Sequence, residues 1–236
     1  MIWSGIEYNG KHSYRDFGLT LESRKIGNPS KNKILESVPF SNTQYDFSSL
    51  YGDQEYLERE LTYVFNITGE MGRNHLYVRE TDILHWLMPP SKKIKLKDDK
   101  LPGFYFMAEV FESPDDEDYF VGGKLTVSFT AYPFKIADQE EGHDRWDEFN
   151  FLWDVAQTTS FTVSGRLDTI LYNPGAKHAR PDIQASEAMQ IIKEGVTYQV
   201  KKGESASFDF VLKPGQNHLR IIGNGTISFN YRKEMI

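Results

Sequence analysis

Apolar and polar residues alternate with a period of two along much of the chain. The stretches ELTYVFNITGE and KLTVSFTAY show this pattern most clearly. Their apolar positions are Leu61, Tyr63, Phe65, Ile67, Leu125, Val127, Phe129 and Ala131. Successive side chains of a strand point to opposite faces of its sheet, so each run has one core face and one solvent face. The pattern predicts antiparallel sheets rather than βαβ units.

Short alternating runs, among them FDFVLK and TISFNYR, continue from about residue 158 to the end of the chain. Turn signals separate them: KPGQN and GNG bracket HLRII, and we interpret GNG (223–225) as a turn between two strands. Gly195 and the following VTYQV favour a strand over a helix at 189–192. Short strands separated by frequent turns indicate a β-sandwich or jelly roll.

One helix is expected in the first half of the chain. In NHLYVRETDILHWLMPP, the residues Leu76, Ile83, Leu84 and Leu87 fall roughly on one helical stripe, and the two prolines at 89–90 end it. An acid-rich stretch after residue 135 then marks a change in composition. We therefore predict a mainly β protein with two domains: an α+β N-terminal domain with one helix (1–137) and an all-β jelly-roll sandwich (138–236).

Composition narrows the function. The 236 residues carry a net charge of −7, which argues against a general nucleic-acid binder because phosphate backbones require a basic surface. The absence of cysteine excludes a disulfide framework, a thiolate metal site and a cysteine nucleophile. No signal peptide and no apolar run of ~20 residues is seen, so we expect a protein that is made and folded in the cytosol and does not insert into a membrane.

Motifs for catalysis are missing. The six histidines form no HxH, HxxxH or HExxH pair, and there is no GxSxG elbow and no phosphate-binding loop. SPDDEDY (113–119) lacks the residue order of a calcium loop and is interpreted as a solvated hairpin tip. A glycoside-processing enzyme would need two facing carboxylates, an alternative that the sequence leaves open. We predict no catalytic residue, no metal and no cofactor.

Two loops carry candidate binding residues. LYNPGAKHARPDIQAS (171–186) is either a connection between strands or a ligand-binding loop that uses His178 and Arg180. Trp146 and Trp153, with two phenylalanines between them, either face the core of an edge strand or form a platform for sugar rings. In the second interpretation of both loops, the protein is a carbohydrate-binding module or adhesin for a host cell-wall saccharide.

Several stretches together resemble one family, the distal tail proteins of long-tailed phages that infect Gram-positive bacteria. They are LYNPGAKHARPDIQAS, LKPGQNHLRIIGNGTISFNYR, ILESVPFSNTQYDFSSLYGDQEYLERELTYVF, the helix ending in HWL, the KLKDD step and FYFMAEV. Each stretch is weakly specific, but their order covers most of the chain. The sequence departs from the family pattern at its first turn, which reads Val38-Pro39-Phe40, whereas a Gly-Arg-like continuation of this turn is common in the family.

The resemblance implies a non-enzymatic baseplate hub located at the distal end of the virion tail. In this family the N-terminal domain resembles tail-tube proteins and forms a homohexameric ring. The C-terminal domain is a galectin-like or carbohydrate-module-like jelly roll outside the ring. The implied partners are other copies of the chain, the tail tube protein, the tape-measure or tail-associated protein, and the receptor-binding proteins that serve host attachment.

A ring needs subunit contacts that close by rotation, and open strand edges can supply them. We expect this interface on the two long alternating runs, at Leu61, Tyr63, Phe65, Leu125, Val127 and Phe129. Opposite charge blocks would set the register between subunits. The blocks are Lys92, Lys93, Lys95, Lys97 and Lys100 on one side, and Asp115, Asp116, Glu117 and Asp118 on the other.

Overall fold

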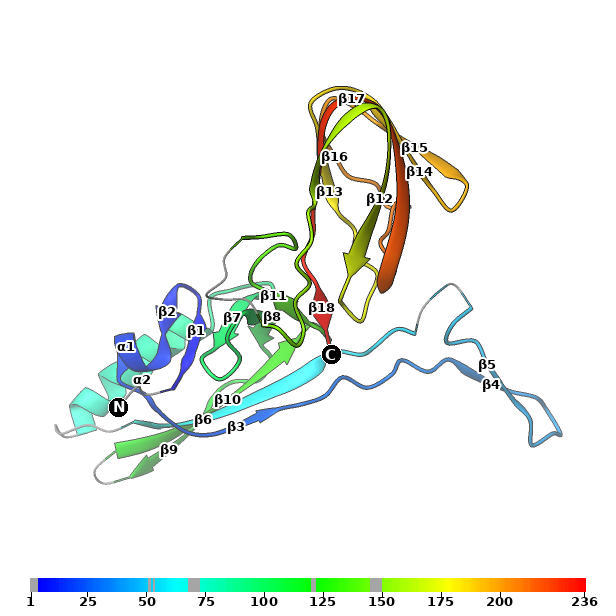
Figure 1. Cartoon of the computed structure of the whole chain (residues 1–236). Coiled ribbons are helices and arrows are strands. Elements are labelled where there is room, and N and C mark those ends of the chain that lie inside the picture. Colours follow the sequence, from blue (N-terminus) through cyan, green and yellow to red (C-terminus); the bar gives the residue numbers. More distant parts are fainter. Residues whose placement is uncertain (1–3, 51, 53, 68–72, 120–121, 145–149) are drawn as a thin grey trace. The chain divides into compact units, whose positions relative to one another are not determined.

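The computed structural model describes residues 4–50, 52, 54–67, 73–119, 122–144 and 150–236 (Figure 1). The chain divides into two compact units, residues 1–135 with Ile236, and residues 136–235, whereas the sequence analysis placed the division at 137/138. Both units are rich in antiparallel strands, so the predicted mainly β class is confirmed.

Unit 1 is built on one antiparallel sheet whose strands follow the order β2-β1-β7-β8-β10-β6-β3, with β9 also paired to β10. The strands are β1 (Ile6–Tyr8), β2 (Lys11–His12), β3 (Thr20–Ile26), β6 (Arg59–Ile67), β7 (Ile94–Asp98), β8 (Phe104–Val110), β9 (Asp115–Tyr119) and β10 (Gly122–Ala131). The two predicted alternating runs are β6 and β10, which pair with each other along their whole length. Tyr63 lies opposite Val127 and Leu61 opposite Phe129, so the apolar positions share one face and form the core.

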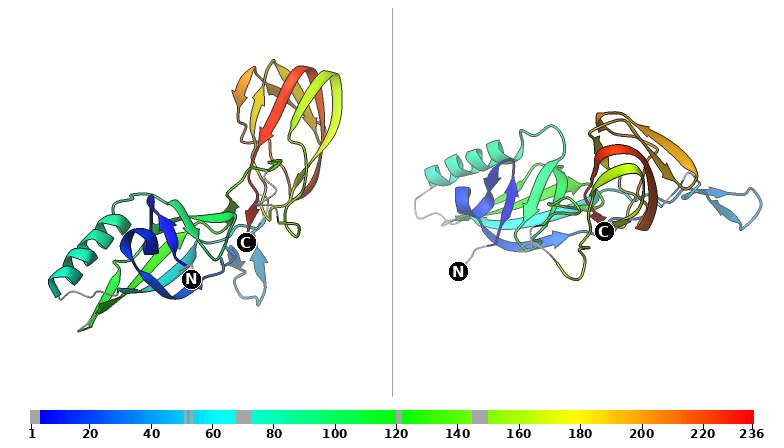
Figure 2. Two further views of the ribbon diagram at one scale, coloured as in Figure 1. Left: turned by 60° about the vertical axis from the view of Figure 1, so that its left-hand side comes forward. Right: turned by 45° about the horizontal axis from the view of Figure 1, so that its top comes forward.

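Two helices pack in unit 1, where the sequence analysis expected one. The predicted helix is α2 (Arg73–Leu87); Ile83 and Leu87 are buried as expected, but Leu84 is exposed and Trp86 takes a core position. The second helix, α1 (Ser13–Phe17), is a single short turn capped by the His12 ring, which accepts hydrogen bonds from two backbone N–H groups. Phe17 stacks on Trp86 with ring centroids 4.7 Å apart, which holds α1 beside α2 (Figure 2).

Residues 28–57 lead out of β3 and return into β6 as an arm that carries a two-stranded sheet of its own. The sheet consists of β4 (Leu35–Ser37) and β5 (Gln44–Asp46). Backbone hydrogen bonds between Asn32 and Glu55 (2.9 Å) and between Leu57 and Ser30 (2.8 Å) join the two sides of the arm at its base. The sequence analysis predicted no such element.

Unit 2 is a single six-stranded sheet that curls around its own core. Its strands are β12 (Ser160–Asn173), β13 (Asp182–Ala185), β14 (Met189–Lys193), β15 (Val196–Val200), β16 (Gly203–Ser205) and β17 (Gly215–Asn230). The 16-residue β17 pairs with β12 on one edge and with β14 and then β13 on the other. Two short strands, β11 (Lys135–Ala137) and β18 (Glu234–Met235), pair with each other. The predicted strand at 189–192 is confirmed as β14.

Two local predictions in unit 2 are wrong. GNG is no turn, because β17 runs through Gly223-Asn224-Gly225 and stays paired with β12. The glycines allow the sharp bend of both strands that Figure 1 shows: Gly165 of β12 lies opposite Gly223 and has a φ of 77°. FDFVLK is no regular strand either. Leu212 makes an isolated bridge to Ala179, Phe210 is buried, and Phe208 is exposed.

Candidate functional site

Metal coordination finds no support in the part of the chain that the structure describes. Within those residues no cluster of three or more His, Cys, Asp or Glu side chains could hold a metal ion. No helix among them is both long and apolar enough to cross a lipid bilayer. The remaining candidates are surfaces and buried polar clusters.

The loop between β12 and β13 is organised by a buried side chain rather than around a cleft. Asn173 donates hydrogen bonds from Nδ2 to the carbonyl oxygens of Lys177 (2.8 Å) and Leu212 (2.9 Å), and its Oδ1 accepts from the N–H of Gly175 (2.9 Å). Because a buried amide that satisfies three backbone groups fixes a turn, this part of the loop has a structural role. Asp182 begins strand β13.

His178 and Arg180 lie on the same loop but differ in exposure. Arg180 is exposed, and its guanidinium lies 4.3 Å from the ring centroid of Phe208, whereas His178 is half-buried. The sequence analysis did not single out Phe208, since it assigned that residue to an alternating strand. An exposed aromatic ring beside an arginine is a surface feature that can contact a partner.

Trp153 lies on a tight turn that presents three consecutive apolar side chains to solvent. Phe151, Leu152 and Trp153 are all exposed, and Trp153 retains 46% of its accessible surface. Asn150 holds the turn: its carbonyl oxygen accepts from the N–H of Asp154 (2.8 Å), and its Oδ1 accepts from the N–H of Leu152 (3.0 Å). Trp153 is therefore not a core residue. Trp146, the other predicted contact, lies outside the described residues.

A buried ion cluster fixes the base of this turn. The Nζ of Lys233 lies 3.6 Å from Glu141 and also binds the carboxylate of Asp154, and all three side chains are almost completely buried. Burial raises the pKa of Glu141, although Lys233 and the amide of Gln157 act in the opposite direction. Perturbed carboxyl groups occur at catalytic sites, but this cluster pairs its charges internally and ties residues 141 and 154 to the end of the chain.

This raised pKa makes the stability of unit 2 depend on pH. The folded protein binds the Glu141 proton more tightly than the unfolded chain, whose pKa is about 4.5. The contribution of Glu141 protonation to the free energy of unfolding is therefore complete below pH 4.5. It is lost as the pH rises through the pKa that Glu141 has in the folded protein. We expect the melting temperature of Glu141→Gln, relative to wild type, to rise between pH 4.5 and neutral pH. Thermal unfolding across this range checks the slope, and a constant or falling difference would contradict the assignment.

The structure corrects the six residues proposed for the subunit interface. Leu61, Tyr63, Phe65, Leu125, Val127 and Phe129 are each at most 3% exposed and belong to the core of unit 1. The strands that carry them are also interior to the sheet: β6 lies between β10 and β3, and β10 lies between β6 on one edge and β8 with β9 on the other. Their side chains and strand edges are thus occupied within the subunit, so contacts with another copy need other elements.

Two longer strands of unit 1 have one edge that pairs with no described strand. They are β3, which pairs only with β6, and β9, which pairs only with β10. These strands lie on opposite margins of the sheet, because β10 and β6 separate them. An unpaired edge presents a row of N–H and C=O groups to a neighbouring strand. Two different free edges suit a head-to-tail contact between copies.

The predicted charge blocks are partly used within the subunit. Lys93 forms ion pairs with Glu58 (2.6 Å) and Glu109 (3.1 Å), and Lys95 lies 4.3 Å from the ring centroid of Tyr105. The acidic block 115–118 lies on β9, so it follows a free sheet edge. A role of the blocks in setting the register between copies remains a prediction.

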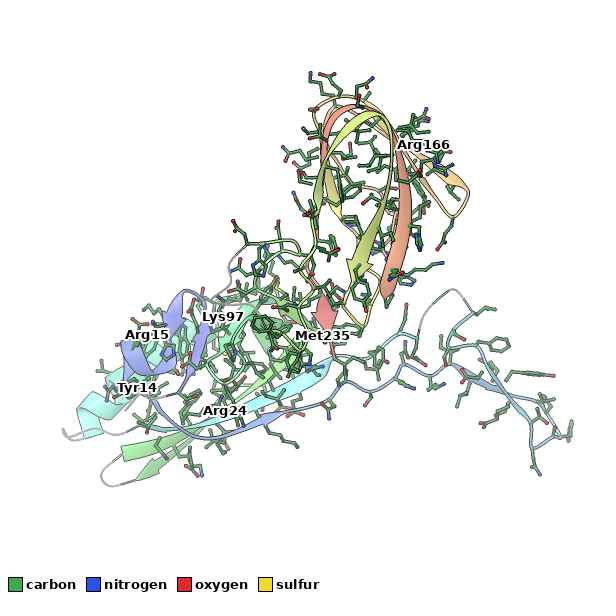
Figure 3. All side chains as sticks on the ribbon, in the orientation of Figure 1. Tyr14, Arg15, Arg24, Lys97, Arg166 and Met235 are labelled. Carbon is green, nitrogen blue, oxygen red and sulfur yellow. The ribbon has the colours of Figure 1, made fainter. Side chains whose placement is uncertain are left out.

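Side chains project from the arm (Figure 3), and several of them are both apolar and exposed. The group consists of Ile34, Leu35, Phe40, Tyr45, Phe47, Leu50 and Leu57. A lone two-stranded hairpin is at best marginally stable in water, and clustered exposed apolar residues mark interaction sites. Polar contacts, such as Lys33 with Asp46 (2.6 Å), hold the hairpin without covering these side chains. We call residues 28–57 the arm below.

Sequence reasoning missed the arm as a surface, although a signal for it is present. In ILESVPFSNTQYDF the apolar residues are irregularly spaced and sustain neither a period of two nor one of 3.6 along the stretch. Apolar residues without a regular period cannot line one core face. The absence of a regular period is therefore a signal in the sequence that the apolar residues of this segment are exposed and available for contact with another chain.

Comparison with solved structures finds a protein of similar fold. The structure is similar to the crystal structure of Dit from phage SPP1, described as a paradigm of the hub adsorption apparatus in phages that infect Gram-positive bacteria. The match covers 99% of both chains with a TM-score of 0.69 and 13% sequence identity. No family model and no curated protein matches the sequence. The chain therefore has a Dit-like fold, as the sequence resemblance predicted.

Proposed function

We propose that the protein is the hub of a phage tail tip, a non-enzymatic ring of six copies. The single observation that carries the proposal is the match to the SPP1 Dit hub over 99% of both chains. The order of the resembling sequence stretches supports it independently of the coordinates. In the proposed assembly the ring lies at the distal end of the tail. It connects the tail tube to the tape-measure or tail-associated protein and to the receptor-binding proteins.

The surfaces of unit 1 support a head-to-tail ring. A heterologous contact needs two different patches on each copy, and unit 1 has the free edges of β3 and β9 together with the exposed arm. Apolar side chains on the arm would supply the contact area, and strand edges would supply directed hydrogen bonds. The assignment of these patches replaces the six core residues proposed from the sequence.

Native mass tests the assembly. We expect a hexamer at high protein concentration, measured by light scattering or native mass spectrometry, and a closed ring by electron microscopy. Because the contact area is mainly apolar, the hexamer should persist in high salt, which screens exposed charges but strengthens apolar burial. A monomer at low and high salt, at the high local concentration of an assembling tail, would contradict the proposal.

A second candidate function is recognition of a cell-wall saccharide by unit 2. The exposed turn Phe151-Leu152-Trp153 favours it, since a solvent-facing indole can stack on a sugar ring. His178 and Arg180 are the other proposed contacts. If the turn binds saccharide, Trp153→Ala should weaken binding at least about tenfold, the loss of roughly 1.4 kcal/mol. Titration calorimetry with purified wall polysaccharide measures this, and Phe111→Ala, which removes an exposed ring from unit 1, serves as the aromatic control. No heat signal from the wild-type protein would reject the candidate.

A further inference from the structure

Unit 1 contains a buried arginine, Arg59, and two of its N–H donor groups have no acceptor among the described residues. Arg59 begins strand β6, is only 4% exposed, and points into the same face as the core residues Leu61 and Tyr63. Its Nε and Nη2 atoms have no hydrogen-bond partner among the described residues. Burial lowers the pKa of Arg59 because the charged form is desolvated. A buried charge without a partner is strongly unfavourable, so the arrangement calls for an anion.

The sequence makes room for this side chain. In the sheet Arg59 lies opposite Ala131 of β10, and Ala131 lies opposite Ala108 of β8. Two methyl groups in this row leave space for the guanidinium to extend across the strands, and it ends 5.3 Å from the ring centroid of Phe106. Larger residues at either alanine would fill the space. The ring stabilises the cation but offers no acceptor in the plane of the guanidinium.

The acidic residues next to Arg59 along the chain do not reach it. Glu60 points to the opposite face of the sheet, because neighbouring side chains of a strand alternate, and Glu58 precedes the strand; both are exposed. Glu58 pairs with Lys93 (2.6 Å), and Glu60 accepts a hydrogen bond from Thr62 (3.3 Å). Neither carboxylate therefore neutralises Arg59.

A second cation lies nearby. Lys135 is half-buried, with its Nζ 5.6 Å from the ring centroid of Phe104, and Phe104 and Phe106 share one face of β8. Burial lowers the pKa of Lys135, and the charge of Arg59 lowers it further. Two cations over adjacent rings repel each other and attract the same anion. Lys135 is partly exposed, whereas Arg59 is buried, so Lys135 is the member of the pair that solvent reaches.

The direction of the two unpaired N–H donors of Arg59 indicates which kind of anion fits the site. Nε–H and Nη2–H lie on the same side of the guanidinium and point in parallel, which is the arrangement that a carboxylate accepts with both oxygens. We propose that Arg59, assisted by Lys135, is a binding site for a carboxylate group presented by a partner chain. The site does not depend on the hub assignment, since its test uses free carboxylate and the single chain.

Direct binding is measured on the full-length protein by nitrogen-15 NMR. The Nε–H signal of Arg59 is identified by its absence in Arg59→Met and is followed while acetate replaces chloride at constant ionic strength. We expect a saturable shift of this signal in the wild type. In Arg59→Lys, which keeps the charge but loses the paired donors, acetate binding followed on the neighbouring backbone signals should weaken at least about tenfold. An unshifted Nε–H signal would overturn the proposal, and tighter binding of inorganic phosphate than of acetate would assign the site to a free anion instead of a protein carboxylate.

Thermal unfolding provides the second readout. In chloride, Arg59→Met should melt at a higher temperature than wild type, because it removes an unpaired buried charge. In acetate the difference should narrow or reverse, since only the wild type binds the anion. Lys25→Met, which removes an exposed cation from β3 of the same sheet, should show the same difference from wild type in both salts. An equal effect of acetate on wild type and Arg59→Met would also overturn the proposal.

Discussion

Lys233→Met is expected to destabilise unit 2 by about 3–5 kcal/mol. The substitution keeps most of the buried side-chain volume but removes the cation that Glu141 and Asp154 share. Two buried carboxylates then face each other without a counter-charge, and one of them must take up a proton or the region must open to water. Urea unfolding at neutral pH, followed by circular dichroism, measures the loss of free energy of unfolding.

Two further variants separate this charge effect from the loss of a lysine as such. Lys202→Met removes an ion pair with Glu187 at 2.8 Å, but both side chains are mostly exposed, so a change of at most about 1 kcal/mol is expected. Adding Glu141→Gln to Lys233→Met should restore part of the stability, because one of the two carboxylates disappears. If Lys233→Met cost no more than Lys202→Met, the buried cluster would not hold unit 2 together.

The sequence predicted those parts of the fold in which local pattern and tertiary environment agree. Strands β6 and β10 bury one face against a core, so their alternation is complete and their pairing follows from it. Helix α2 was found because Ile83 and Leu87 are spaced as one helical stripe and two prolines end the helix, although Leu84 of the predicted stripe is exposed. In these elements the local pattern was sufficient to predict strand or helix, although single positions such as Leu84 and Arg59 depart from it.

The errors occur where distant residues decide the local structure. Gly223 and Gly225 have the chemistry of a turn, yet β12 pairs with β17 across them and converts the turn into a bend. The interface residues were misplaced for a related reason: an alternating run shows that one face is buried, but not whether the burial is within or between subunits. Arg59 continues the alternation of β6 as a charged residue at a core position, and only the structure shows that its donors lack acceptors.

Several apolar side chains of the arm are exposed, and the main intramolecular ring contact among them is that of Tyr45 with Phe47, whose centroids are 6.2 Å apart. The double variant Phe40→Ser, Tyr45→Ser removes two exposed aromatic rings from the tip and from β5. If each ring is an anchor worth about 2 kcal/mol at the subunit contact, the dissociation constant of the ring should rise on the order of 10³-fold. The melting temperature of the single chain should stay nearly unchanged, because surface substitutions away from packed contacts usually alter stability by about 0.5 kcal/mol or less.

The experiment on the arm distinguishes an effect on assembly from an effect on the stability of the single chain. Phe208→Ser removes an exposed ring from unit 2 and should leave assembly intact. Native mass spectrometry over a dilution series gives the dissociation constant for each variant, and thermal unfolding of the diluted chain gives its stability. A hexamer that survives the double variant at every dilution would exclude the arm from the contact and leave the edges of β3 and β9 as the remaining surfaces. A lower melting temperature of the single chain would instead show that the arm packs on its own subunit, contrary to its exposure.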